Sequence, residues 1–206
     1  MISIIDYNAG NLTSVKRALD YLGMPSRITP DPGEVLSAQR VIFPGVGHAA
    51  ASMECIRSRG LDQALREAFE RGTPILGICL GTQIVLSHSE EGDTQCVGLL
   101  EGETRTFTLR DPRLKIPHMG WDRIRVLRPH PVLQGIRAEN EFYFVHSFFP
   151  RPALDEQVIA TCEYEVEFPA VIASGSLIAS QFHPEKSGKA GLRLLKNFCT
   201  WEGEGC

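Results

Sequence analysis

Short β-rich runs and segments of helical periodicity alternate through the first 80 residues, and this alternation is the strongest constraint on the fold. Residues 2–7 form an apolar run that we interpret as a strand, and residues 12–22 then carry their apolar side chains at helical spacing. The pattern returns with a strand at 40–43, a helix at 61–72 and a strand at 74–78. Strands that alternate with helices in this way form a parallel sheet wrapped by helices.

The periodicity changes to two from about Glu103 onward. We expect strands at residues 104–109, 123–126, 141–145, 158–163 and 170–173. A turn at residues 174–175 then leads into a further strand at 177–183 and a helix that carries Leu192, Leu195 and Phe198. The predicted fold class is therefore α/β, with a mostly parallel central sheet flanked by helices and an antiparallel extension.

Length and composition limit the functions that this chain can have. It has 206 residues, of which 43% are hydrophobic, and it shows no internal repeat or linker, so we expect one domain spanning residues 1–206. No basic leader or long apolar segment is present, which predicts a cytoplasmic protein without a membrane span. The net charge of -4, with dispersed acidic residues, argues against nucleic-acid binding and favours a small substrate.

Six cysteines lie at wide and irregular spacings, without a CxxC pair, so we expect reduced thiols and no metal site. They are Cys55, Cys79, Cys96, Cys162, Cys199 and Cys206. A free cysteine is most often a small buried hydrophobic residue. Residues 201–206 form an acidic segment to which we assign no role, and we expect its residues 202–206 to be frayed.

Of the six cysteines, only Cys79 lies in a segment whose pattern indicates catalytic chemistry. It lies in the segment GICLG at residues 77–81, between a predicted strand and a helix-like segment at 83–88, which is the pattern of a nucleophile elbow. Flanking glycines allow such a sharp turn, and the following helix favours a thiolate and brings the N–H of Leu80 toward an oxyanion. The alternative interpretation is a structural turn that is tight because of its glycines.

The segment QFHPE at residues 181–185 supplies a base for this nucleophile. If the segment continues the strand, His183 and Glu185 face the same side, so that Glu185 orients the imidazole of His183. The alternative is a surface turn. A third segment, PGVG at residues 44–47, has two glycines that allow close backbone approach, and the N–H of Val46 is our candidate for a second oxyanion donor.

These three segments, in this order, resemble the class I (triad) glutamine amidotransferases, and the resemblance covers nearly the whole chain. Finer features are similar to one family among them, the glutaminase subunit of imidazole glycerol phosphate synthase (HisH type) in histidine biosynthesis. The segments that carry the finer resemblance are DYNAGN at 6–11, PGVG at 44–47, GICLGTQ at 77–83, PHMGW at 117–121, FYFVHS at 142–147 and QFHPEKS at 181–187.

The resemblance implies a reaction without a cofactor. Cys79 would attack the side-chain amide of glutamine to form a γ-glutamyl thioester, with His183 relaying protons and Glu185 orienting His183. Ammonia would leave and water would release glutamate. The side chain of Gln83 and the backbone of Gly47 would help to bind the glutamine.

The resemblance also implies a partner, a cyclase barrel subunit of the HisF type that forms a heterodimer and receives the ammonia to make imidazole glycerol phosphate. Asn11, Trp121 and Lys186 match positions toward that interface, with the PHMGW segment beside the ammonia exit. From the residues alone, Trp121 reads as a buried anchor and Lys186 as a solvated charge. We expect the isolated chain to be a poor glutaminase, and partner docking to complete its oxyanion hole by a peptide flip in residues 44–47.

Other readings remain open at this point. The chain is alternatively a paralogous glutaminase that feeds another synthase, in pyridoxal phosphate or amino-sugar assembly. A second alternative is a cysteine hydrolase or chaperone with the same elbow, which has no need of the HPE segment near its end. A third is an inactive binding module, which would be expected to lack a triad member. The sequence departs from the family at Phe148 and Phe149, where an aromatic hydroxyl is common.

Overall fold

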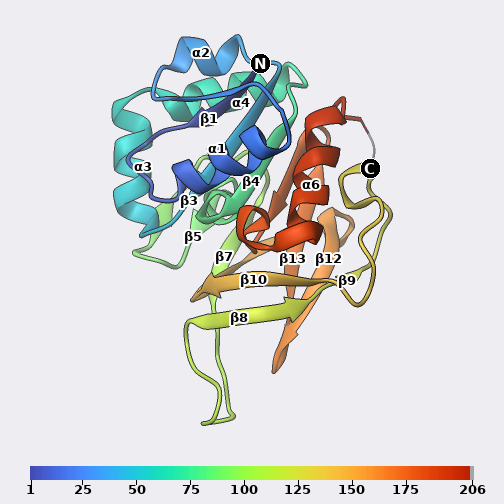
Figure 1. Ribbon diagram of the computed structural model, residues 1–206. Helices are drawn as coiled ribbons and strands as arrows, with labels where there is room; N and C mark the ends of the chain where they lie inside the picture. The colour runs from blue at the N-terminus through green and yellow to red at the C-terminus, as the bar shows by residue number, and fades with distance from the viewer. Residues whose placement is uncertain (205–206) are drawn as a thin grey trace.

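An eight-stranded sheet organises the computed structural model, which describes residues 1–204 (Figure 1). Gly205 and Cys206, the end of the tail that we expected to be frayed, lie outside the described residues. The strands follow the order β2, β1, β3, β4, β14, β13, β12, β9. The parallel part consists of β1 (Ile2–Ile5), β2 (Ser26–Thr29), β3 (Arg40–Gly45), β4 (Ile75–Cys79) and β14 (Leu177–Ser180). The antiparallel part consists of β13 (Val166–Ser174), β12 (Val158–Tyr164) and β9 (Arg125–Val126), which confirms the predicted fold class.

Helices cover both faces of this sheet because successive strand residues point to opposite sides. In β1, Ile4 packs into one apolar core and Ile5 into the other. The core with Ile4 receives α1 (Leu12–Tyr21) and α6 (Gly188–Thr200), which lie side by side in Figure 1. The core with Ile5 receives α2 (Pro32–Leu36), α3 (Ala49–Ser58), α4 (Leu61–Glu70) and α5 (Leu80–Ile84).

Two smaller sheets extend the structure. One pairs β10 (Glu141–His146) with β8 (His118–Arg123) and lies below the helices in Figure 1. The other has the order β11 (Phe148–Pro152), β7 (Gly102–Thr106), β5 (His88–Ser89) and β6 (Thr94–Gln95). Short 3-10 turns occupy Pro131–Leu133, Asp155–Gln157 and Pro184–Lys186.

Two of the expected elements are wrong at positions that matter for the site. The helix expected at residues 83–88 is α5, which runs from Leu80 to Ile84 and stops early. The carbonyls of residues 84–87 accept hydrogen bonds from the N–H groups of residues 96–100, so they cannot continue a helix. The strand expected at residues 177–183 ends at Ser180. The N–H of Gln181 still bonds Ala170 on the neighbouring strand β13, but the N–H of His183 donates to Tyr143 on β10, and Pro184 has no N–H to give.

Within residues 1–204, none of the helices combines the length and the apolar character that a membrane crossing requires. The same part of the chain contains no cluster of three or more His, Cys, Asp or Glu side chains arranged to hold a metal ion.

Candidate active site

The candidate site lies where three adjacent parallel strands end. Gly45 at the end of β3 is in register with Cys79 at the end of β4, and Ser180 of β14 is in register with Ile78. The segment that carries His183 follows β14 directly. Carboxyl ends of parallel strands meet at one edge of a sheet, so the three segments found in the sequence converge there.

Cys79 occupies a strained elbow. Its φ of 53° and ψ of -107° lie in a region that residues with a side chain rarely adopt, and α5 begins immediately after it. The turn depends on both flanking glycines. A Cβ on Gly81 would lie 1.8 Å from the carbonyl oxygen of Phe43, and a Cβ on Gly77 would lie 2.8 Å from the Cβ of Ala179. These contacts give a physical reason for the GICLG pattern.

His183 and Glu185 meet in a turn. Their predicted alignment along a strand is wrong, since Pro184–Lys186 is a 3-10 turn that begins after His183. The turn nevertheless brings Nδ1 of His183 to 2.8 Å from Oε1 of Glu185, with both side chains fully buried. The backbone N–H of His183 donates to the carbonyl of Tyr143 on β10 at 2.9 Å, which ties the turn to the second sheet.

The charge on His183 is stabilised by its neighbours. Burial lowers the pKa of His183, but the adjacent Cys79 sulfur and Glu185 carboxylate outweigh burial and raise the pKa to about 9. Its Nε2 atom is buried without a hydrogen-bond partner among residues 1–204. Nδ1–H donates to Glu185, so Nε2 is the atom that is available to exchange a proton with Cys79 or a ligand.

Asn11 lies nearer to this pair than its expected place at a partner interface suggests. It is half-buried, and its side-chain amide donates to the same Glu185 oxygen that accepts from His183. Asn11 has a left-handed backbone (φ 77°) at the start of α1 and makes no side-chain cap there, which leaves its amide to reach Glu185. The contact fixes the carboxylate that orients His183.

A cavity of about 310 Å³ opens beside Cys79. Its lining includes Val46, Gly47, Leu80 and Gln83, all of which were expected there from the sequence. In the PGVG segment, only Gly47 has a positive φ (119°). Gly45 is needed for space, since a Cβ there would lie 1.9 Å from the hydroxyl of Tyr7.

Three residues of this site were not predicted from the sequence. Gln181 is fully buried, and its amide nitrogen lies 3.8 Å from Sγ of Cys79. Glu91 and His146 line the cavity beside Cys79. Gln181 and His146 lie inside the recognised segments QFHPE and FYFVHS, so their place near the site could have been predicted. Glu91 reaches the cavity from a loop that carries no motif.

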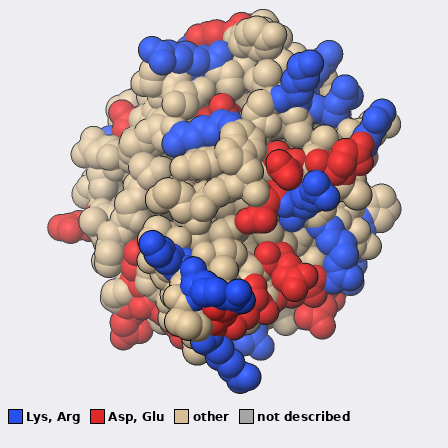
Figure 2. All heavy atoms as spheres, turned by 60° about the horizontal axis from the view of Figure 1, so that its bottom comes forward, with Lys and Arg blue, Asp and Glu red and all other residues tan. Residues whose placement is uncertain are grey.

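The expected interface residues Trp121 and Lys186 lie on the outside. Trp121 is 52% exposed, so the reading of a buried anchor is wrong, and Met119 beside it on β8 is 62% exposed. Lys186 is exposed, and its ammonium lies 5.7 Å from the ring centre of Tyr143, whose ring also contacts Trp121. Figure 2, which brings the lower side of Figure 1 forward, shows a broad area without charged side chains next to a charged region.

The arrangement has the parts of a covalent acyl-transfer site. A cysteine on a strained elbow, an imidazole beside it and a carboxylate behind the imidazole form a nucleophile, a base and an orienting group. The cavity lies on the open side of Cys79 and contains the polar side chains of Gln83 and Glu91. Such a site can attack the carbonyl carbon of a small polar amide or ester.

Comparison with known proteins agrees with this chemistry. The model of the family described as "Glutamine amidotransferase class-I" matches residues 3–201. The chain is 52% identical to "Imidazole glycerol phosphate synthase subunit HisH" of Nitratidesulfovibrio vulgaris (strain DP4), over 96% of this chain and 95% of the relative. It is 49% identical to the protein of the same name from Moorella thermoacetica, over 96% of this chain and 93% of the relative.

Solved structures share the fold at lower identity. "Crystal structure of glutamine amidotransferase" superposes with a TM-score of 0.76 at 20% identity, covering 98% of this chain and 99% of that chain. "Structure of PurLQS from Thermotoga maritima" gives a TM-score of 0.72 at 17% identity, covering 96% of both chains.

Proposed function

The chain belongs to the class I glutamine amidotransferases, and from this premise we propose that it is the HisH-type glutaminase subunit of an imidazole glycerol phosphate synthase. Its reaction is the hydrolysis of glutamine to glutamate and ammonia, with the ammonia passed to a cyclase subunit of the HisF type. The observation that carries the proposal is the buried Glu185–His183 pair beside Cys79 at one edge of the parallel sheet.

The residues act in a fixed sequence of steps. The sulfur of Cys79 attacks the side-chain amide carbon of glutamine, and Nε2–H of His183 gives its proton to the leaving nitrogen. Ammonia departs and a γ-glutamyl thioester remains. Nε2 of His183 then takes a proton from water as the water attacks the thioester, and glutamate is released with regeneration of Cys79. Glu185 keeps Nδ1 protonated and the ring oriented throughout.

The cavity supplies groups suited to glutamine. The amide of Gln83 and the backbone of Gly47 lie beside Cys79, and Glu91 provides a carboxylate for the substrate's ammonium group. The N–H of Leu80, at the start of α5, is one donor for the oxyanion of the tetrahedral intermediate. Val46, which also lines the cavity, is the candidate for the second.

The partner surface is formed by β8 and the segment after His183. Trp121 and Met119 present exposed apolar area, and Lys186 adds a charge beside them. Large exposed apolar side chains next to a polar rim are typical of protein interfaces. We place the cyclase on this surface, with residues 117–121 beside the ammonia exit.

The proposed function also includes the domain organisation and the location of the protein. Residues 1–206 act as one domain, because a single sheet separates the two apolar cores that the helices close. The protein works in the cytoplasm, where cysteines remain reduced, as suits the five free thiols within residues 1–204.

The family match leaves no reason to retain a cysteine hydrolase outside the amidotransferases. A paralogous glutaminase for another synthase remains the second candidate function, since the triad would be the same in both. The name HisH, shared by relatives 49–52% identical to this chain, favours the histidine pathway.

A reconstituted assay tests the proposed function. The purified chain is mixed with a HisF-type cyclase, and glutamate release is measured with and without the cyclase and its nucleotide ligand. We expect slow hydrolysis by the chain alone and an increase of about 10²–10³-fold in the complex, the usual value of one oxyanion donor. Equal turnover in both conditions would contradict activation by the partner. Absence of glutamate in both conditions would contradict glutamine hydrolysis.

A further inference from the structure

Two buried histidines outside the triad face each other across the β8–β10 pair. His118 and His146 are in register, and their side chains are almost completely buried, with 1% and 4% of each residue exposed. The rings of Phe107, Phe144 and Phe168 surround them. Burial lowers the pKa of both imidazoles, that of His146 to about 3. Polar rings in such an aromatic environment destabilise the fold unless they are hydrogen-bonded.

Their hydrogen bonds form a chain that begins near the surface. Oδ2 of Asp122 lies 2.7 Å from Nε2 of His118, and Nδ1 of His118 lies 3.0 Å from Nε2 of His146. Nδ1 of His146 lies 2.8 Å from the carbonyl oxygen of Phe148. A carbonyl oxygen can only accept, so Nδ1 of His146 carries the proton and donates to it, and Nε2 of His146 accepts from Nδ1–H of His118. The bond from His118 to the Asp122 carboxylate then requires a second proton, on Nε2 of His118, a charged state that Asp122 favours and burial opposes.

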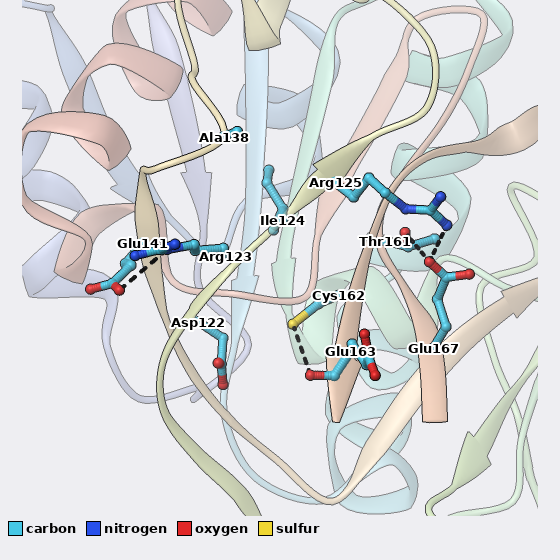
Figure 3. A pocket seen from close by; sticks show the side chains of 10 residues that line it. All are labelled: Asp122, Arg123, Ile124, Arg125, Ala138, Glu141, Thr161, Cys162, Glu163 and Glu167. Atoms are coloured by element: carbon cyan, nitrogen blue, oxygen red, sulfur yellow. Dashed lines mark hydrogen bonds and ion pairs between the residues drawn. The ribbon is translucent and has the colours of Figure 1, made fainter. Parts of the chain in front are cut away.

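Asp122, at the outer end of this series of hydrogen bonds, is open to solvent. The side chain of Asp122 is 41% exposed and lines a cavity of about 450 Å³ on the side of β8 (Figure 3). Cys162 and Glu163 of β12 line the same cavity. Asp122 therefore joins the buried imidazole pair to a surface that lies outside the cavity beside Cys79.

At its inner end, the series of hydrogen bonds continues from the Phe148 carbonyl toward Cys79. The Phe148 carbonyl accepts a second hydrogen bond from Nε2 of Gln83, at 2.8 Å. The same Nε2 donates to Oε1 of Gln181 at 3.1 Å, and Nε2 of Gln181 lies 3.8 Å from Sγ of Cys79. His146 and Gln83 thus share one acceptor, and both line the cavity beside Cys79.

This arrangement fixes which way the Gln83 amide points. A free glutamine amide can rotate and exchange its nitrogen and oxygen. Here both N–H groups of Gln83 are used by Phe148 and Gln181, so Oε1 is left to accept from a ligand. The orientation holds only while the Phe148 carbonyl stays in place, and the donor that holds it besides Gln83 is His146.

We propose that His118 and His146, anchored by Asp122, are positioning residues for the glutamine site. They hold the Phe148 carbonyl so that Gln83 presents its side-chain oxygen to the substrate. Neither imidazole touches the reacting atoms. The inference rests on the proposed function, since it assigns residues to the binding of glutamine.

The test measures KM and kcat for glutamine in the complex with the cyclase. His146→Leu removes the donor to Phe148, and we expect KM to rise roughly two- to tenfold, the range for one lost neutral hydrogen bond. We expect kcat to change by less than about twofold, because the triad is untouched. His146→Asn keeps an amide N–H near the position of Nδ1 and should return KM most of the way to the wild-type value.

The control is Phe144→Leu, a loss of ring packing beside both histidines without loss of a hydrogen bond. An equal rise of KM in Phe144→Leu and His146→Leu would overturn the proposal in favour of general packing. Asp122→Ala alters an exposed side chain and serves if the buried variant fails to fold. It should also raise KM, by a smaller factor. An unchanged KM would overturn the positioning role of these hydrogen-bonded residues.

The outcome separates this inference from the proposed function. A wild-type complex that releases no glutamate contradicts the glutaminase assignment itself. A wild-type complex that is active, combined with a wild-type KM in folded His146→Leu, contradicts only the positioning role.

Discussion

His183 combines burial with a raised pKa, two properties that oppose each other unless a negative group is close. Burial acts to lower the pKa, and the value of about 9 arises because Cys79 and Glu185 favour the charged imidazole. At neutral pH the ring is therefore protonated, as the proposed transfer of a proton to the leaving ammonia requires. Asn11 supports this by donating to the Glu185 oxygen that accepts from His183.

Substitution of the pair should separate proton transfer from orientation. We expect His183→Asn to reduce glutaminase kcat by about 10²–10⁴-fold, the usual effect of losing a positioned acid–base group. Glu185→Gln should cost less, since the imidazole remains but is less well oriented and less often charged. Steady-state assays in the complex decide this, and wild-type turnover in both variants would mark residues 183–185 as a purely structural turn.

His130 gives the fold an acid sensitivity at the residue scale. It is 5% exposed, and burial lowers its pKa to about 4, while an unfolded chain titrates near 6.5. The unfolded state then binds more protons between these values, so the free energy of unfolding decreases as pH falls from about 6.5 to about 4. For this residue alone, the decrease from pH 7 to pH 5 is about 2 kcal/mol.

His130→Asn should reduce that pH dependence. An asparagine can still accept from the N–H of Val132, which bonds Nδ1 of His130 at 3.1 Å. It also removes Nε2, which is buried without a partner among residues 1–204. Urea unfolding at pH 7 and pH 5 measures the difference. The same loss of stability in wild type and variant would show that His130 does not control it.

At the scale of elements, the elbow between β4 and α5 requires glycine at Gly81, because no side chain fits there. A Cβ at Gly81 would lie 1.8 Å from the Phe43 carbonyl oxygen, and strand β3 cannot move away without breaking its pairing with β4. We expect Gly81→Ala to reduce the free energy of unfolding by more than about 3 kcal/mol or to prevent folding. Gly33→Ala in α2, where the nearest atom is the flexible Asp31 carboxylate, should change stability by less than about 1 kcal/mol. Equal stability of the two variants would contradict this role of the glycine.

Some of these elements could be predicted from the sequence and others could not. Strands β1, β3 and β4 and helices α1 and α4 were predictable because their apolar spacing is local. The early end of α5 was not, since its free carbonyls bond residues 96–100 from a later segment. The convergence of Cys79, His183 and Glu185 at one edge of the sheet was predictable from their motifs. The His118–His146 contact was not, because it depends on a strand register that pairs residues 28 positions apart in the sequence.

At the scale of the whole molecule, Trp121 should anchor the partner. It is 52% exposed on β8, and aromatic side chains that become buried at an interface commonly dominate its binding energy. We expect Trp121→Ala to weaken the affinity for the cyclase roughly tenfold or more. Tyr21→Ala is the matched control, because Tyr21 is 80% exposed at the far end of α1 from Asn11. Titration calorimetry provides the comparison, and equal affinities would move the interface away from β8.

The proposed function depends most on Cys79 as the nucleophile. Its most direct test is the Cys79→Ala variant in the complex with the cyclase, assayed with glutamine and, separately, with ammonium salt, beside Cys55→Ala as a control thiol. We expect that Cys79→Ala releases no glutamate and supports no synthesis from glutamine, but still supports the cyclase reaction from ammonium. Cys55→Ala should match wild type in both. Glutamate release by Cys79→Ala at the wild-type rate would show that Cys79 is not the nucleophile.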